Sequence, residues 1–181
     1  MIQLYCGEGK GKTTAAIGQA VRAAGSGMRV IFSQFMKGND TGELHTLWQI
    51  KNIEIVRSPK NFGFYSTLSE EEKRELTQIH NEILDRLLLA VKAGECDMVI
   101  LDEITYPVSF HLIDESRLQE LLSFGHGRED AEVNTGKEVE IILTGRDPAG
   151  FMTDQADYIT KMHAVRHPFE KGIAARKGIE Y

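Results

Sequence analysis

Residues 2–14 read IQLYCGEGKGKTT: an apolar run over residues 2–6 is followed by a glycine-rich turn that ends in Gly-Lys-Thr. A helical pattern of apolar residues begins directly after this turn. A strand, a glycine-rich turn and a helix in this order are typical of a phosphate-binding loop, whose backbone N–H groups converge on an anion at the positive end of the helix. The stretch therefore predicts a site for a nucleoside triphosphate, and the alternative is an ordinary glycine-rich turn between a strand and a helix.

The residues of this turn have distinct expected roles. Lys12 is expected to reach the far phosphates, and the Thr13 hydroxyl is expected to ligate Mg²⁺. The first glycine stands one place later than the general pattern G-x-x-x-x-G-K-[ST] requires, because Cys6 occupies that place. The predicted nucleotide contacts from the turn are Gly7, Glu8, Gly9, Lys10, Gly11, Lys12, Thr13 and Thr14.

A second stretch with chemical content is DMVILDE, residues 97–103, in which an apolar run ends in Asp102 and Glu103. Carboxylates at the carboxyl end of a strand can hold Mg²⁺ directly or through water. Many buried strands end in an acidic residue, so this pattern alone is weak evidence for a metal site. It becomes strong evidence because the opening loop occurs in the same chain. The predicted metal-binding residues are Thr13, Asp102 and Glu103, and the predicted catalytic residues are Lys12, Thr13 and Glu103.

Arg146 follows another apolar run and is a candidate clamp for a phosphate group. The alternative is a surface arginine in a turn.

The order of apolar runs and helical patterns indicates the fold class. Strands are expected at residues 2–6, 28–35, 53–56, 97–103, 139–144 and 156–162. Helices are expected after the opening loop, over 41–51 and from the capping box at Ser69 to Gly94, and one or two helices are expected over 105–122. With the opening loop, this order predicts an α/β, single-domain P-loop NTPase-like (RecA-like) fold spanning 1–181, with a mostly parallel sheet and helices on both faces.

Four side chains outside the motifs are assigned from their place in these patterns. Trp48 is expected to face the core from the helix over 41–51, together with Leu44 and Leu47. His80 lies next to the apolar stripe of the long helix and is expected to be a core-edge or surface residue rather than a catalytic one.

Two loops stand apart from the regular elements. Residues 58–68 hold Phe62, Phe64 and Tyr65 without periodicity, which fits either a segment packed under the sheet or the lip of a binding site. Residues 123–137 are polar and glycine-containing, which predicts an exposed excursion with solvated side chains, His126, Arg128 and Asp130 among them.

The whole chain has 181 residues, 41% of them hydrophobic, a formal net charge of −6 and two cysteines. No run is long enough to cross a bilayer and no signal-peptide pattern is present, so no membrane partner is expected. The net charge argues weakly against nucleic acid as the main partner. Two cysteines form neither a disulfide framework nor a metal cluster, which fits a reducing cytoplasm.

The chain as a whole resembles the P-loop type of cob(I)alamin (corrinoid) adenosyltransferase. The matching stretches are GEGKGKTTAAIGQAVRAAG, VIFSQFMKGNDTGE, MVILDEITYPV, IILTGRDP, DQADYITKM and HPFEKGIAARKGIEY, in this order over nearly the whole chain. The resemblance implies transfer of the 5′-deoxyadenosyl group of ATP to the cobalt of a reduced corrinoid, such as cobalamin, with release of tripolyphosphate. It also implies a Mg²⁺-dependent reaction, a homodimer and an electron donor such as a flavoprotein.

The resemblance also implies functions for particular residues. Family positions near the nucleotide are matched by Gln34, Phe35, Lys37 and Glu43. Family members usually carry Gly-Phe-Thr-Trp before the long helix, where the aromatic residues line the corrinoid pocket. Here Phe64 keeps its place, Ser66 stands at the tryptophan position, and Tyr65 supplies an aromatic ring one residue earlier. Phe64 and Tyr65 are therefore the predicted corrinoid-binding residues.

Two other classes of function remain open at this point. A different P-loop enzyme, such as a small kinase or an ATPase, would release ADP, and Glu103 could serve it by polarising water. A non-catalytic binder of ATP or corrinoid would be stabilised by its ligand without turnover.

Overall fold

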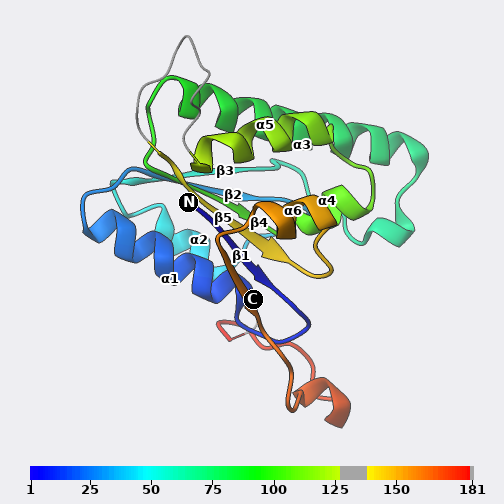
Figure 1. Ribbon diagram of the computed structural model, residues 1–181. Coiled ribbons are helices and arrows are strands. Elements are labelled where there is room, and N and C mark those ends of the chain that lie inside the picture. The colour runs from blue at the N-terminus through cyan, green and yellow to red at the C-terminus, as the bar shows by residue number, and fades with distance from the viewer. Residues whose placement is uncertain (127–137, 180–181) are drawn as a thin grey trace.

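The computed structural model describes residues 1–126 and 138–179 of the chain. Within them, six parallel strands form one sheet in the order β3-β2-β4-β5-β1-β6 (Figure 1). The strands are β1 (Ile2–Cys6), β2 (Val30–Gln34), β3 (Ile53–Arg57), β4 (Met98–Asp102), β5 (Glu140–Gly145) and β6 (Tyr158–Lys161). β2, β4 and β5 are almost fully buried, because helices cover both faces of the sheet.

The helices divide between the two faces (Figure 1). α1 (Lys12–Gly25) and α2 (Gly42–Leu47) pack against one face through small and aliphatic side chains such as Ala16 and Leu47. The opposite face is covered by α3 (Glu70–Lys92), α4 (Thr105–Ser109), α5 (Glu115–Ser123) and α6 (Gly150–Gln155). Short 3₁₀ turns lie at Tyr65–Thr67, Phe124–His126 and Pro168–Lys171. The predicted α/β fold with a parallel sheet and helices on both faces is confirmed.

The sheet brings the motifs to one edge. The register pairs Gln34 of β2 with Asp102 of β4, and Cys6 of β1 with Gly145 of β5. All four residues stand at the carboxyl ends of their strands, so the loops that follow these strands meet there. This is the edge at which parallel α/β sheets bind ligands.

Two local expectations differ from the structure. The helix expected over 41–51 is the shorter α2, which ends at Leu47, so that Trp48 follows it with 59% of its surface exposed. Leu44 and Leu47 are buried, and their spacing already fills the inward face of this two-turn helix. The last strand is also shorter than the expected 156–162.

The long helix begins as expected. The Ser69 side chain accepts a hydrogen bond from the Glu72 N–H, and the Glu72 carboxylate accepts one from the Ser69 N–H at 2.8 Å. This is the capping box that the sequence indicates.

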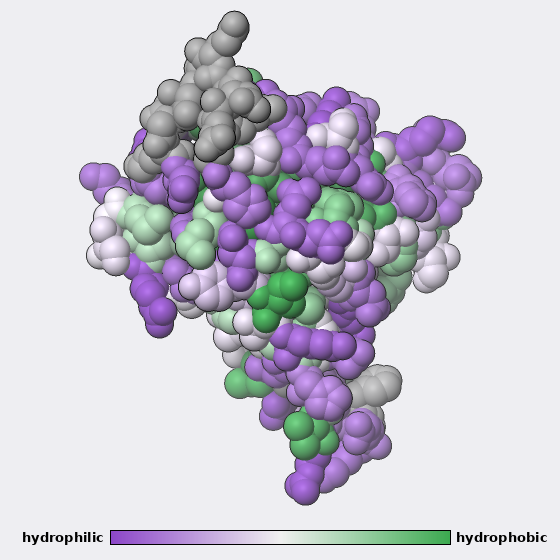
Figure 2. Space-filling view, viewed as in Figure 1, coloured by the Kyte–Doolittle hydropathy of each residue, from purple (hydrophilic) through white to green (hydrophobic). Residues whose placement is uncertain are grey.

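The excursion expected over 123–137 lies largely outside the described residues, and so do Arg128 and Asp130. Of its described part, Gly125 is buried, and His126 Nε2 lies 3.2 Å from an Asp157 carboxylate oxygen. In residues 1–126 and 138–179, no helix is both long and apolar enough to cross a membrane. Figure 2 shows a mainly hydrophilic surface in this view, with the segment after β6 projecting from the body.

His80 is fully buried in the middle of α3, deeper than a core-edge position. Burial lowers the pKa of its imidazole from 6.5 to about 4. The unfolded chain therefore takes up a proton at higher pH than the folded protein does.

We expect the free energy of unfolding to fall as the pH drops from about 6.5 to about 4, because the contribution of neutral His80 is present above this window and lost within it. Urea unfolding across the window measures the fall. The fall should be smaller in His80→Gln, since glutamine takes up no proton, and an equal fall in both proteins would contradict the assignment.

Candidate active site

The glycine-rich loop (residues 7–11) is held against the segment that follows β6. The Gly9 N–H donates to the Met162 carbonyl at 2.9 Å, and the Met162 N–H donates to the Cys6 carbonyl at 2.8 Å. A Cβ atom at Gly7 or Gly9 would overlap the Met162 backbone. Gly7 and Gly11 also have positive φ angles of 102° and 115°. Glycine is therefore required at these places for the loop to take this shape.

Lys12 lies across the loop. Its Nζ donates to the Gly7 carbonyl at 2.7 Å and to the Gly9 carbonyl at 2.9 Å. Burial lowers the pKa of Lys12, and the positive charge of Arg146 lowers it further. Arg146, which is exposed beyond β5, is therefore close enough for its charge to affect the Lys12 ammonium. Two cations thus lie beside the glycine-rich loop.

Asp102 is the centre of a hydrogen-bond network at the end of β4. It is fully buried, and its Oδ1 accepts from the Thr13 hydroxyl at 2.8 Å and from the Thr144 hydroxyl at 2.7 Å. Its Oδ2 accepts from Lys37 Nζ at 2.9 Å. Burial alone would lower the pKa of Lys37, but the carboxylates of Asp102 and Glu103 outweigh it and raise that pKa. The Asp102 carboxylate at the end of β4 is thus hydrogen-bonded to the first turn of α1, to the end of β5 and to the segment after β2.

Thr144 completes this network from the neighbouring strand, since its hydroxyl also accepts from the Glu103 N–H at 2.9 Å. Thr144→Val keeps the shape of the side chain but leaves the Glu103 N–H without its partner in a partly buried place. We expect the free energy of unfolding to fall by about 1–3 kcal/mol, measured by urea denaturation. Thr144→Ser keeps the hydroxyl and should lose less; equal losses in the two variants would show that the hydroxyl bonds do not matter.

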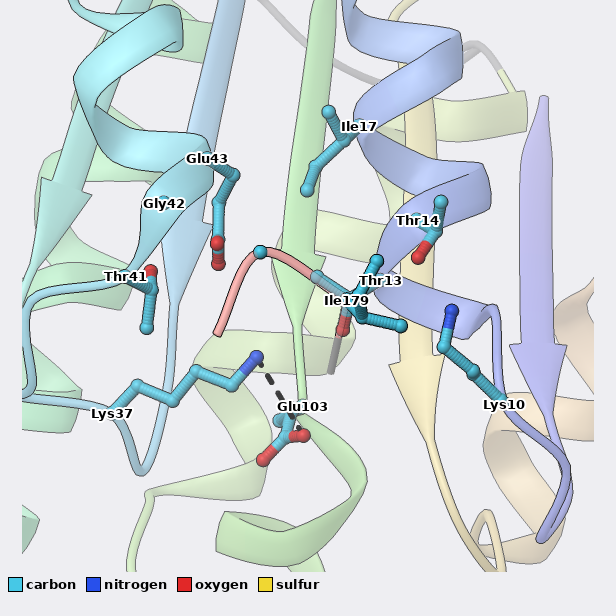
Figure 3. Close-up of a pocket in the computed structure, with 11 residues that line it drawn as sticks. Lys10, Thr13, Thr14, Ile17, Lys37, Thr41, Gly42, Glu43, Glu103 and Ile179 are labelled. Atoms are coloured by element: carbon cyan, nitrogen blue, oxygen red, sulfur yellow. Dashed lines mark ion pairs between the residues drawn. The ribbon is translucent and has the colours of Figure 1, made fainter. Parts of the chain in front are cut away.

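Glu103 follows Asp102 in an unusual backbone conformation. Its φ of 63° lies in the left-handed region, which is costly for a residue with a side chain and is often found at functional sites. Its carboxylate lies 3.7 Å from Lys37 Nζ. Burial raises the pKa of Glu103, while Lys37 opposes the rise. The turn at Glu103 directs this side chain into the cleft rather than along the strand (Figure 3).

The donor set at this point fits Mg²⁺, because it combines a threonine hydroxyl and carboxylates, the oxygen ligands this ion prefers. Both oxygens of Asp102 already accept hydrogen bonds from protein groups, so Asp102 fits best as a residue that orients Thr13 and holds the ion through water. No group of three or more His, Cys, Asp or Glu residues arranged to hold a metal ion is found in the described part of the chain.

A cavity of about 680 Å³ opens beside the loop. Figure 3 shows Lys10, Thr13 and Thr14 on one side of it, Thr41 and Glu43 on the other, and Glu103 between them. The remaining lining residues are Ile17, Lys37, Gly42, Gly178 and Ile179. The end of the chain therefore contributes to the same cavity as its beginning.

Gln34 and Glu43 come together beneath this cavity, with Gln34 Nε2 3.3 Å from a Glu43 oxygen. Gln34 is fully buried, and its Oε1 has no hydrogen-bond partner among the described residues. Glu8 is exposed and lines neither this cavity nor the second one described below.

A second cavity, of about 640 Å³, lies on the other side of Lys37 and Glu103, which line both cavities. Four of its eleven lining residues are aromatic. Phe64 is 82% exposed, and Tyr65 stacks on Phe110 with ring centroids 4.1 Å apart. The other lining residues are Met36, Asn39, Asn61, Gly63, Ser66 and Tyr106. Of the two interpretations of residues 58–68, the structure favours the lip of a binding site, because Phe64 is exposed at a cavity.

The family model for the ATP:corrinoid adenosyltransferase BtuR/CobO/CobP matches residues 1–181. The chain belongs to this family. Its relatives include the corrinoid adenosyltransferase of Escherichia coli strain K12, 30% identical over 181 residues, which cover the whole chain and 85% of the relative. The corrinoid adenosyltransferase CobA of Salmonella typhimurium is 31% identical over the whole chain and 85% of the relative. That of Pseudomonas aeruginosa is 27% identical over the whole chain and 83% of the relative.

The resemblance drawn from the sequence is thereby confirmed, and with it the assignment of the chain to an enzyme family of adenosyltransferases. Three residues in the neighbourhood were not anticipated. Thr144 could have been found as a polar residue at the end of an apolar strand, level with Asp102. Tyr106 and Phe110 could have been found as two aromatic residues four places apart, the first of them three residues after Glu103.

Proposed function

We propose that the protein transfers the 5′-deoxyadenosyl group of ATP to the cobalt of a reduced corrinoid and releases tripolyphosphate. The observation that carries this proposal is the pair of cavities that meet at Lys37 and Glu103. One cavity adjoins the glycine-rich loop, and the other has four aromatic side chains in its lining, which suit a large planar ring. Two substrates bound there would share one boundary.

In this reaction the electron pair of Co(I) attacks the C5′ carbon of ATP, a cobalt–carbon bond forms, and the C5′–O5′ bond breaks. Its electron pair leaves with tripolyphosphate, and the cobalt is formally oxidised from +1 to +3. Co(I) is itself a strong nucleophile, so the protein has to align it with C5′ and stabilise the leaving group. Alignment can lower the barrier by about 7–11 kcal/mol at most.

The residues around the loop are suited to the leaving group. The N–H groups of residues 7–14, the ammonium of Lys12 and the guanidinium of Arg146 would hold the triphosphate as negative charge grows on it. Lys10 would act from the flank of the loop. Thr13, oriented by Asp102, and the carboxylate of Glu103 would hold Mg²⁺. When bound, Mg²⁺ supplies positive charge to the phosphate oxygens.

The nucleoside part has its own candidate contacts in the first cavity. Glu43 lines the wall opposite the loop and is tied to the buried Gln34. Lys37 lies between the two substrates, where it neutralises Asp102 and faces Glu103.

Phe64 and Tyr65 are proposed to form one wall of the corrinoid pocket and to exclude a lower axial ligand from the cobalt. Tyr65 is fixed by its stack on Phe110, whereas Phe64 stands exposed at the cavity. Tyr65 thus supplies an ordered aromatic face in place of the tryptophan that Ser66 replaces.

The double variant Phe64→Ala/Tyr65→Ala should lose about tenfold or more in adenosylation rate when the assay starts from Co(II) corrinoid and a reductant, since the ring loses its aromatic walls. Started from chemically prepared Co(I) corrinoid, the loss should be smaller. Equal rates for variant and wild type from Co(II) would contradict the assignment of both residues.

Three further properties belong to the proposal. Residues 1–181 act as one catalytic domain, and an electron donor such as a flavoprotein supplies Co(I). The protein forms a homodimer, for which the exposed apolar residues Tyr158 and Ile159 on the edge strand β6 offer a surface. Sedimentation of the protein measures its oligomeric state.

The transfer itself is tested by mixing the protein anaerobically with ATP, Mg²⁺ and chemically reduced cobalamin, and following the cobalt absorbance. The expected product is light-sensitive adenosylcobalamin. An unchanged spectrum, together with stabilisation of the protein by cobalamin, would instead indicate a binder without turnover.

A further inference from the structure

We propose that His80 is a positioning residue, which holds the turn at residues 36–37 and thereby places the Lys37 ammonium at the junction of the two cavities. Its side chain comes from α3, far along the chain from the glycine-rich loop and outside every motif of the sequence.

The turn that carries Lys37 has a costly backbone conformation. The Phe35 N–H still continues the sheet, donating to the Asp102 carbonyl at 2.9 Å. At Met36 the chain leaves the strand with a φ of 58°, a left-handed conformation that a residue with a side chain adopts at a cost. The next residue, Lys37, then reaches Asp102 at 2.9 Å. Something must hold Met36 in this conformation for the ion pair to form.

His80 provides the hydrogen-bond acceptor for this turn. The Met36 N–H donates to His80 Nε2 at 3.3 Å, and the imidazole ring lies against Phe35 with ring centroids 5.4 Å apart. The Met36 side chain packs on the cluster of Leu68, Leu76 and Leu112. Both the backbone and the side chain of Met36 are thus held from the α3 side.

The geometry also fixes the protonation state of the imidazole. An Nε2 atom that accepts a hydrogen bond carries no proton, so the ring is neutral with its proton on Nδ1. The low pKa that results from burial agrees with this state. The Leu112 backbone also interacts with the imidazole and partly opposes the fall of its pKa, but Nδ1 has no hydrogen bond of good geometry within the described residues. A leucine could fill the same space without burying a polar ring, so the well-formed bond to Met36 is the main contribution of the histidine.

The consequence for the site is direct. Lys37 lines both cavities and neutralises the buried Asp102, so a turn that relaxes would draw this charge away from both substrates. The effect on the reaction rests on the proposed function, but the placement of Lys37 by His80 does not.

The test uses three variants of the full chain. His80→Leu removes the acceptor, and His80→Gln keeps one, since the glutamine amide oxygen reaches as far as Nε2. Gln78→Leu introduces the same residue on the exposed side of α3 and serves as the control. His80→Met is a second apolar variant in case leucine does not fold. Unfolding in urea and near-ultraviolet circular dichroism identify the folded variants.

The first measurement is the rate at which acetic anhydride labels Lys37, determined by mass spectrometry relative to the exposed Lys51 of the same molecule. Ion pairing with Asp102 protects Lys37, so its relative rate should rise about tenfold in His80→Leu. It should stay near the wild-type rate in His80→Gln and Gln78→Leu. An unchanged Lys37 rate in folded His80→Leu and His80→Met would overturn the proposal, and so would a His80→Gln variant that behaves like His80→Leu.

The second measurement is turnover with ATP and reduced cobalamin. We expect kcat to fall about tenfold in His80→Leu and to recover in His80→Gln, with KM for ATP changed by less than about twofold. A rise in KM with kcat unchanged would contradict a positioning role in the reaction. If the wild type itself shows no transfer, the proposed function fails while the labelling result still decides how Lys37 is placed.

Discussion

Lys12→Ala should lower kcat for adenosyl transfer by about a hundredfold to a thousandfold, the range found when one preorganised donor to a developing negative charge is removed. Lys12 is partly buried, whereas Lys10 and Arg146 are exposed, and its Nζ spans the carbonyls of Gly7 and Gly9. Its loss removes positive charge from the triphosphate and also frees the loop. Steady-state rates with ATP and reduced cobalamin measure the effect.

The matched control for Lys12→Ala is Lys10→Ala, which removes a lysine of the same loop that is exposed and hydrogen-bonds to no described residue. Lys10→Ala should cost much less in kcat. Turnover of Lys12→Ala at the wild-type rate would contradict the role given to the loop, and equal losses in both variants would show that only the total charge matters.

Asp102→Asn should have a double effect, on stability and on the requirement for Mg²⁺. Lys37 is about three-quarters buried and would lose the charged partner of its ion pair, a change that typically costs about 3–5 kcal/mol in free energy of unfolding. Thr13 would also lose the acceptor that orients its hydroxyl. We therefore expect turnover at wild-type Mg²⁺ concentrations to be abolished. Urea denaturation and a Mg²⁺ titration of the rate measure the two effects.

The control for Asp102→Asn is Asp97→Asn at the opposite end of the same strand. Asp97 pairs with Arg29, whose side chain is 47% exposed, at 2.9 Å. This variant should lose less stability and keep the wild-type Mg²⁺ titration. A wild-type Mg²⁺ titration in Asp102→Asn would remove Asp102 from the magnesium site.

The sequence predicted those parts of the molecule whose chemistry is local. The glycine-rich loop and the Asp-Glu pair can each be recognised from neighbouring residues, and parallel strands then bring them to one edge of the sheet. The capping box of α3 is local in the same sense, because Ser69 and Glu72 are three residues apart.

The parts that were missed depend on residues far apart in the chain or on backbone angles. Thr144 meets Asp102 only because β5 lies beside β4, and His80 meets Met36 only because α3 crosses the end of β2. The left-handed conformation of Glu103 has no signal in its residue type. Trp48 was misplaced because the helix ends one residue before it, and helix ends are poorly marked in short helices.

The most direct test of the central claim is the identity of the phosphate product, because it reports which bond of ATP breaks. Phosphorus NMR of the anaerobic reaction with reduced cobalamin should show tripolyphosphate, formed in step with adenosylcobalamin. ADP in place of tripolyphosphate would show cleavage at the terminal phosphate and would contradict adenosyl transfer; inorganic phosphate formed with the ADP would indicate a hydrolase, and a phosphorylated acceptor would indicate a kinase.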